Sequence, residues 1–184
     1  MNMKKWRSEL ASLLKNTKSN KGVELGVYRG RSFHSCLKSN PQLVLTGIDA
    51  WKSEEGYPQF KLFLYEIVCR LIRLRYCNRA YLIKGDVTEC VNRFADKSLD
   101  FVHYDLFNFR TSSVAFHEKV LRLWIPKIRE NGILVGRNFS EKDIAAAFQN
   151  LGLQYYSYKD GNSVSEKLLY TTIHHNRNTN SLDQ

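Results

Sequence analysis

The 184-residue sequence predicts a doubly wound α/β fold with a mostly parallel seven-stranded sheet and an antiparallel C-terminal hairpin. Five short apolar segments alternate with segments of helical hydrophobic spacing, which is the β-α order that a parallel sheet requires. Glycines or acids follow several of the apolar segments, as expected where strands end beside a ligand. Near the C-terminus, two alternating segments flank Asp160-Gly161-Asn162-Ser163, which is a hairpin signal.

The first elements are predicted from apolar spacing and turn residues. Apolar residues at helical spacing predict a short helix over 4–14, and the apolar run over 22–27 predicts the first buried strand. A helix over 32–38 follows, with Ser32 as its cap. The second strand is predicted over 43–49, and a long helix over 58–76 carries a wide apolar stripe that we expect to pack in the core.

The later elements continue the same alternation up to the hairpin. They are a strand over 80–84, a helix over 87–94, a strand over 98–105, a helix over 112–124, a strand over 132–136, a helix over 141–150, and hairpin strands over 154–159 and 167–173. The sequence thus predicts one domain over residues 1–173. The polar segment 174–184 is predicted to be a disordered tail.

The first strand and the turn after it carry the strongest indication of a ligand. Gly26 and Gly30 allow backbone N–H groups to approach a ligand, and the following helix brings a partly positive end. Glu24 adds a carboxylate suited to hydroxyls and a cationic amine. Asp49 ends the second strand 19 positions after Gly30, the place where an acid binds ribose hydroxyls in nucleotide-binding βαβ units. Trp51 follows closely, and its face is suited to an adenine ring.

Two further acids end strands. Asp86 follows the third strand, where it either accepts a bond from an exocyclic amine or caps the next helix. Asp105 ends the fourth strand. Because the carboxyl ends of parallel strands share one edge of the sheet, we expect Glu24, Gly26, Asp49, Asp86 and Asp105 to form a single ligand site there.

Composition limits the possible partners and locations. The net charge of +10 permits a nucleic-acid partner, but the basic residues are spread along the chain, which favours a generally basic surface. The four cysteines occur singly, as expected for reduced, mostly buried thiols. We find neither a run long enough to span a membrane nor a secretory signal, so the sequence predicts a cytoplasmic protein without a membrane partner.

Several motifs together resemble the class I S-adenosylmethionine-dependent methyltransferases, which have a Rossmann-like fold. The motifs are V-E-L-G-V-Y-R-G-R-S, L-T-G-I-D-A-W, K-G-D-V, S-L-D-F-V-H-Y-D and L-R-L-W-I-P-K-I-R-E-N-G-I-L-V-G. They are most similar to the small-molecule O-methyltransferase branch, which includes the macrocin-type sugar methyltransferases.

The resemblance implies S-adenosylmethionine as cofactor and a role for each matching residue. It implies that Glu24, Gly26 and Gly30 shape the methionine and ribose pocket, that Asp49 holds the ribose diol, that Trp51 flanks the adenine, that Asp86 lines its far edge, and that Asp105 helps bind Mg²⁺ or orients the acceptor. Replacing Asp49 with Ala is then expected to abolish cofactor binding with little loss of stability.

The sequence departs from this family at the reaction centre. Arg137-Asn138 stands where the family usually shows His-Asp or Asp-Asn, and a cation at a ligand position should expel Mg²⁺, so we expect no catalytic metal. A hydroxyl acceptor then needs a protein base, for which His103, His117 and Asp105 are the candidates. Arg137 and Arg110 are expected to bind an anionic group of the substrate.

The sequence therefore predicts a metal-independent methyltransferase with a small-molecule acceptor. Two alternatives stay open at this point, namely a cofactor-binding protein without methyl transfer and a basic, nucleic-acid-associated methyltransferase. The sequence also leaves a homo-oligomer open.

Overall fold

A computed structural model describes residues 5–52, 58–106, 113–136, 142–160 and 163–175, with the side chains of 159–167 excluded. The sheet has seven strands in the order β3-β2-β1-β4-β5-β7-β6. The strands are β1 (Lys21–Leu25), β2 (Val44–Asp49), β3 (Ala80–Lys84), β4 (Leu99–Tyr104), β5 (Ile128–Gly136), β6 (Tyr156–Asp160) and β7 (Ser163–Thr172).

The direction of each strand agrees with the predicted topology. Strands β1 to β5 pair in parallel, whereas β7 runs antiparallel to both β5 and β6. The predicted fold class, a mostly parallel sheet closed by an antiparallel hairpin, is confirmed.

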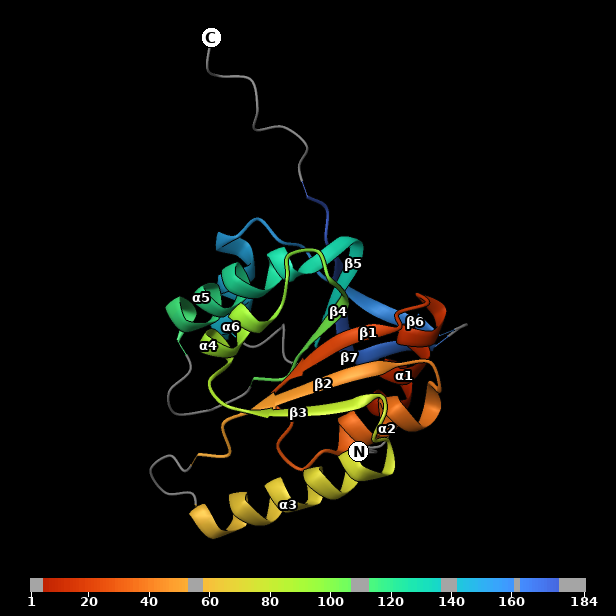
Figure 1. Ribbon diagram of the computed structural model, residues 1–184. Coiled ribbons are helices and arrows are strands. Elements are labelled where there is room, and N and C mark those ends of the chain that lie inside the picture. The colour runs from red at the N-terminus through yellow and green to blue at the C-terminus, as the bar shows by residue number, and fades with distance from the viewer. Residues whose placement is uncertain (1–4, 53–57, 107–112, 137–141, 161–162, 176–184) are drawn as a thin grey trace.

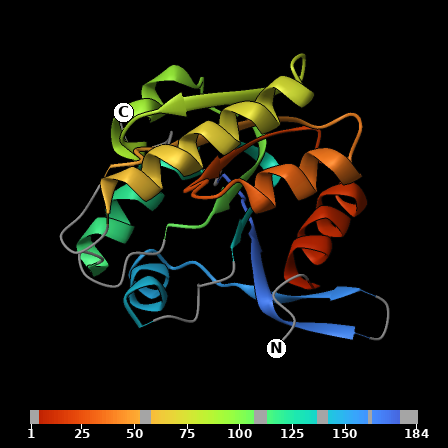
Figure 2. The same ribbon diagram turned by 90° about the horizontal axis from the view of Figure 1, so that it is seen from below.

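Helices cover both faces of this sheet (Figures 1 and 2). The helices on one face are α1 (Lys5–Asn16), α2 (Arg31–Ser39) and α3 (Gln59–Arg75). Those on the other are α4 (Val87–Cys90), continued by the 3₁₀ turn η1 (Val91–Arg93), then α5 (Val114–Trp124), which leads into η2 (Ile125–Lys127), and α6 (Lys142–Asn150). Each face has its own apolar cluster, one around Trp6 and Phe33 and the other around Trp124 and Phe148.

Strand β1 lies in the centre of the sheet, and side chains pack against it on both faces. Val23 and Leu25 enter the cluster of α4, α5 and α6. Gly22 lies on the opposite face, where a Cβ would come within 2.2 Å of the Phe101 ring. The strand therefore needs glycine there to let the aromatic ring pack against its backbone.

Helix α3 departs most from the sequence prediction. Of its residues only Leu62, Glu66 and Cys69 are buried. Most side chains of its wide apolar stripe are exposed, with Phe60 at 68% and Leu74 at 61%, whereas Ile72 is partly buried against the core. The expectation that this stripe packs in the core was wrong, because the helix has apolar residues on two opposite sides and periodicity does not tell which side faces the sheet.

One smaller prediction is also corrected. Helix α2 begins at Arg31 with Gly30 in the N-cap position, so Ser32 is not its cap. After β7, the backbone N–H of His175 donates to Glu130 at 2.8 Å and its ring lies 2.7 Å from the Ile128 carbonyl oxygen. Residues 176–184 lie outside the described residues, and the tail over 174–184 stays a prediction.

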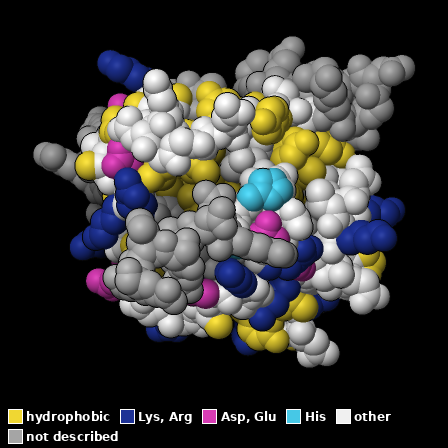
Figure 3. All heavy atoms as spheres, turned by 90° about the horizontal axis from the view of Figure 1, so that it is seen from above, with side chains coloured by type: hydrophobic (Ala, Val, Ile, Leu, Met, Phe, Trp, Pro, Cys, Tyr) yellow, Lys and Arg dark blue, Asp and Glu magenta, His cyan; other side chains and the backbone are white. Residues whose placement is uncertain are grey.

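Basic side chains are widely distributed on the surface. On the face seen from above, the Lys and Arg side chains drawn in colour are spread around the molecule rather than gathered in one place (Figure 3). This distribution fits a generally basic surface better than a dedicated nucleic-acid groove on that face.

Candidate functional site

The carboxyl ends of four parallel strands lie side by side. Three backbone hydrogen bonds extend the pairing one residue past the strands: Gly26 N–H to Ile48 at 2.9 Å, Gly85 N–H to Asp49 at 3.0 Å, and Asp105 N–H to Leu25 at 3.0 Å. Gly85, Asp49, Gly26 and Asp105 are thus brought abreast, in the order of β3, β2, β1 and β4. This is the edge at which ligands bind in open α/β sheets.

Gly26 is required by this arrangement. Its φ of 86° is unfavourable for other residues, and a Cβ there would lie 2.6 Å from the Asp105 carbonyl oxygen. The turn after β1 can approach the end of β4 only without a side chain. This packing accounts for Gly26, and its role beside a ligand stays a prediction.

Glycine is needed at position 30 for a different structural reason. Its φ is 68°, and a Cβ would lie 2.8 Å from Ile72 Cδ1 and 3.0 Å from Cys69 Sγ. Both of these side chains belong to α3. The second glycine of the motif thus lets the start of α2 pack against α3, and its role in cofactor binding stays a prediction.

Asp49 holds the loops around the edge together. Its two carboxylate oxygens accept backbone hydrogen bonds from Tyr28 and Trp51, both at 2.7 Å. Both donors are non-glycine residues with positive φ, 51° and 40°, a conformation that needs such support. Burial raises the pKa of Asp49 above its usual value, and the backbone N–H groups oppose that shift.

Trp51 lies in the core next to Asp49. Its ring is 2% exposed and belongs to the cluster of α1, α2 and α3, and the indole N–H donates to the Tyr28 carbonyl at 3.0 Å. The ring therefore joins the β2 loop to the glycine turn. The predicted contact with adenine stays a prediction.

Glu24 lies in β1, two positions before Gly26, and is fully buried. Its Oε1 accepts a hydrogen bond from the Ser32 hydroxyl and lies 3.6 Å from His103 Nδ1. Its other oxygen, Oε2, is buried without a hydrogen-bond partner among the described residues. An orphaned buried acceptor at this place is suited to a donor supplied by a ligand or a water molecule.

His103 pairs in register with Glu24 on the neighbouring strand. It is 1% exposed, and its ring centre lies 6.1 Å from that of Trp6 in α1. An acceptor molecule cannot reach a ring enclosed in this way. The geometry places His103 as a neighbour of Glu24 and does not support the prediction that it acts as a base.

His117, another candidate base, is also enclosed. It is 1% exposed, and its Nδ1 is hydrogen-bonded to the hydroxyl of Tyr104. Burial lowers the pKa of His117 below its usual value. Its place on the buried side of α5 makes it part of the core rather than of the edge.

Asp86 and Asp105 remain at the edge. Asp86 caps α4, and its Oδ1 accepts from the Thr88 N–H at 2.7 Å and from the Thr88 hydroxyl at 2.6 Å. The hydroxyl bond is the main reason why the pKa of Asp86 lies below its usual value. The capping alternative is thus confirmed, and a contact with the cofactor stays a prediction. Asp105 is half-buried directly after β4.

Part of the predicted centre lies outside the described residues. Arg110, Arg137 and Asn138 fall in the segments 107–112 and 137–141. Among the residues that the structure does describe, no group of three or more His, Cys, Asp or Glu side chains could hold a metal ion. The expectation of no catalytic metal stays a prediction.

Sequence reasoning missed two contributors to the site. Tyr28 supplies the N–H that binds Asp49, and Ser32 supplies the hydroxyl that binds Glu24. The sequence did indicate Ser32, since it stands eight positions after Glu24 in a segment that turns into a helix. Its position predicts the cap of that helix instead of a partner of Glu24. Nothing in the local pattern indicates the positive φ of Tyr28.

The strand order, the glycine turn and the row of strand ends define a class I methyltransferase-like α/β protein. The chain belongs to the methyltransferase domain family Methyltransf_24, whose model matches residues 23–139. The resemblance noted from the sequence motifs is confirmed at the level of this superfamily. S-adenosylmethionine, the expected cofactor, is the methyl donor of this family.

Solved structures show the same fold. An O-methyltransferase from Bacillus cereus in complex with SAH has a TM-score of 0.61 at 12% identity, and the match covers 94% of this chain and 82% of that one. An SAH-bound methyltransferase from Podospora anserina has a TM-score of 0.65 at 12% identity over 96% and 80% of the two chains. A SAM-dependent O-methyltransferase from Thermotoga maritima has a TM-score of 0.64 at 10% identity over 97% and 68%.

No curated protein matches the sequence significantly. Across the described segments, none of the helices combines the length and the apolar character that crossing a bilayer would need.

Proposed function

We propose that this chain is a cytoplasmic S-adenosylmethionine-dependent methyltransferase that acts on a small-molecule acceptor without a catalytic metal. The observation that carries the proposal is the row of strand ends at which Gly26, Asp49 and Asp105 lie abreast. Membership of the methyltransferase family supports methyl transfer as the reaction.

The residues at this edge fit the cofactor. Gly26 lets the turn after β1 lie close against the end of β4, and the buried Oε2 of Glu24 is an acceptor still to be satisfied. Asp49 offers carboxylate oxygens suited to a ribose diol. When bound, S-adenosylmethionine supplies a methyl group on a sulfonium, which is open to in-line displacement.

The protein's own residues then bind the cofactor and orient the acceptor. Asp49 fixes the turn after β1 through Tyr28, so the same carboxylate shapes the pocket and accepts the ribose hydroxyls. Ser32 holds the Glu24 carboxylate in place from α2. Asp105, half-buried at the end of β4, is the candidate that can reach an acceptor hydroxyl and take its proton.

We assign substrate recognition to Arg110 and Arg137, which lie outside the described residues. In the sequence, Arg110 comes six positions after the end of β4 and Arg137 comes directly after the end of β5. A guanidinium is suited to a carboxylate or a phosphate of the acceptor. Arg137 also takes the place of a metal-binding carboxylate, which is why the proposal excludes a catalytic Mg²⁺.

Calorimetric titration with S-adenosylhomocysteine, with and without Mg²⁺, tests the cofactor site. We expect binding that Mg²⁺ does not change, and the absence of binding would refute the proposal. Transfer of a labelled methyl group to hydroxylated acids and phosphates then tests the acceptor class. Binding without any transfer would favour a protein that only binds the cofactor, and salt-sensitive RNA binding would favour a nucleic-acid enzyme.

A further inference from the structure

Helix α3 presents an apolar surface to solvent, which we name the α3 ridge. Its members are exposed by 36% to 68%, and they are Phe60, Phe63, Leu64, Ile67, Val68, Leu71 and Leu74. Single exposed apolar side chains are ordinary, but a contiguous set of this size is not. The ridge exposes on the order of several hundred Å², as much as the largest apolar patch on a typical monomer, and such patches commonly mark interaction sites.

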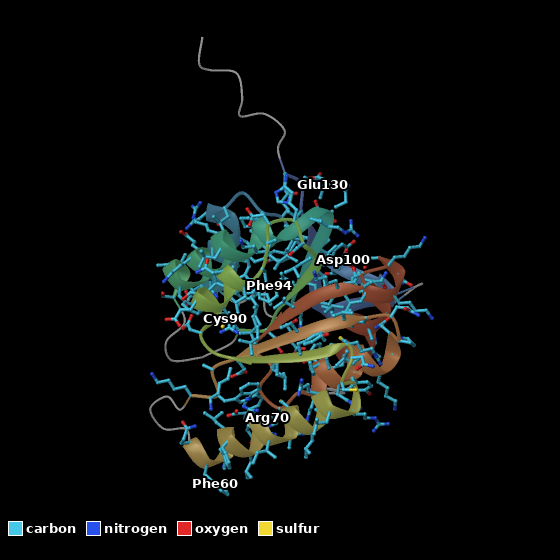
Figure 4. The ribbon with its side chains drawn as sticks, in the orientation of Figure 1. Phe60, Arg70, Cys90, Phe94, Asp100 and Glu130 are labelled. Carbon is cyan, nitrogen blue, oxygen red and sulfur yellow. The ribbon has the colours of Figure 1, made fainter. Side chains whose placement is uncertain are left out.

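The ridge lies opposite the side of α3 that packs on the protein. At about 100° per residue, Phe60, Leu64 and Ile67 fall on one side of the helix, and the buried Leu62 and Cys69 fall on the other. Figure 2 shows α3 as the outermost helix of its layer, and Figure 4 shows Phe60 pointing away from the sheet. The ridge is therefore a convex, protruding surface rather than a groove.

The charges beside the ridge are cationic. The exposed charged side chains of α3 are Lys61, Arg70, Arg73 and Arg75. Its single acid, Glu66, is buried and engaged by Arg70 at 2.7 Å and by Lys84 of β3 at 2.6 Å. The two acids that precede α3 in the sequence, Glu54 and Glu55, lie outside the described residues.

A basic cavity adjoins the ridge on the side of β3. It has a volume of about 610 Å³, and its lining includes Arg70, Arg73, Lys84 and Arg93. Figure 4 shows Arg70 on the side of α3 that faces the sheet. An apolar ridge thus lies between cations on both of its sides, with further cations behind it.

The apolar ridge and the cations around it together distinguish between possible binding partners. A second copy of the chain would match the apolar ridge, but it would bring its own arginines against these arginines. An anionic bilayer matches both parts, because its acyl region accepts apolar side chains and its phosphates face the cations. A helix with Phe and Leu on one side and Lys and Arg at its flanks is typical of helices that lie in the membrane interface.

We propose that the α3 ridge docks the protein on the surface of an anionic phospholipid membrane. Leu71 and its neighbours enter the interface, and Lys61 and Arg75, which lie beside them on the helix, bind lipid phosphates. The sequence expectation of no membrane partner rested on the lack of a spanning segment, and lying on a surface requires none. The proposal does not depend on the proposed enzymatic function.

Flotation of the full chain with lipid vesicles tests this directly. We expect it to float with vesicles of phosphatidylcholine mixed with phosphatidylglycerol and to stay unbound with phosphatidylcholine alone. Raising the salt from about 0.1 M to about 1 M shortens the Debye length from about 10 Å to about 3 Å and should release most of the protein. Failure to float with the anionic vesicles would overturn the proposal.

Matched variants locate the surface. Leu71→Glu should abolish flotation, whereas Tyr156→Glu, which places the same charge at an exposed aromatic residue of β6, should not. Lys61→Gln with Arg75→Gln should weaken binding about thirtyfold, from about 1 kcal/mol per cation, and the control pair Lys15→Gln with Arg122→Gln should weaken it much less. The Lys61/Arg75 pair keeps the test valid if Leu71→Glu does not fold, which circular dichroism would show.

The same variants identify the rival occupant. If the wild-type protein is a dimer by light scattering, Leu71→Glu makes it a monomer, and neither floats, then a second copy covers the ridge and the membrane proposal is wrong. Equal loss of flotation in the ridge variants and in their controls would also overturn it.

Discussion

Replacing Asp49 tests whether one carboxylate both stabilises the loops and binds the cofactor. The sequence alone predicts that Asp49→Ala abolishes cofactor binding with little loss of stability. In the structure, this carboxylate accepts N–H bonds from Tyr28 and Trp51 at 2.7 Å, and both donors have positive φ. We therefore expect Asp49→Ala to lose stability as well as affinity, which corrects the sequence prediction.

The size of the effect follows from these bonds. A hydrogen bond to a charged group contributes about 1.5–3 kcal/mol, and the bond from Tyr28 lies near solvent, where the contribution is smaller. Together they set an expected loss of about 2–4 kcal/mol in the free energy of unfolding for Asp49→Ala. Asp49→Asn keeps one carbonyl oxygen and should lose about half as much.

Urea unfolding followed by tryptophan fluorescence measures this loss. Asp96→Ala serves as control, because it removes an exposed acid that only pairs with Lys127 at the surface and should cost less than about 1 kcal/mol. Titration with S-adenosylhomocysteine should show affinity reduced by about a hundredfold or more in Asp49→Ala, the loss of two charged hydrogen bonds to the diol. An unfolding midpoint equal to wild type would refute the structural role, and an unchanged affinity would refute the binding role.

Three further outcomes are expected. Gly22→Ala should lower the free energy of unfolding by about 1–3 kcal/mol, measured with urea, because its Cβ would overlap the Phe101 ring. The control Gly152→Ala has open space around it and should cost only about 1 kcal/mol, from backbone strain. Equal losses in the two variants would contradict the packing argument. Burial lowers the pKa of His117 in the folded state, so the unfolded chain binds its proton more readily. Stability should thus be lost as pH falls below about 6.5, by at most about 1.4 kcal/mol per pH unit, and His117→Gln should flatten that slope; an unchanged slope in the variant would exclude His117 as its source. Methyl transfer should be the same with EDTA and with added Mg²⁺, and activity that EDTA removes would show that the metal-independent mechanism is wrong.

The sequence by itself determined the parts of this protein that depend on neighbouring residues. Alternation of apolar runs and helical spacing gave the order of strands and helices, and Asp160-Gly161-Asn162-Ser163 placed the hairpin. Gly26 and Asp49 could be assigned to the carboxyl edge of the sheet because a turn and a strand end are local features, and parallel strands bring their ends to the same edge.

Only the tertiary structure decided which surfaces and polar groups meet. The spacing in α3 is the same whether its stripe faces the sheet or the solvent, and the structure exposes Phe60 and Leu74 while it buries Cys69. Ser32 binds Glu24 rather than capping α2, because a side chain chooses among partners that only folding brings within reach. His103 was enclosed by α1, a helix nearly a hundred positions away in the sequence. Contacts of that range depend on the packing of whole layers, and no local pattern of residues contains them.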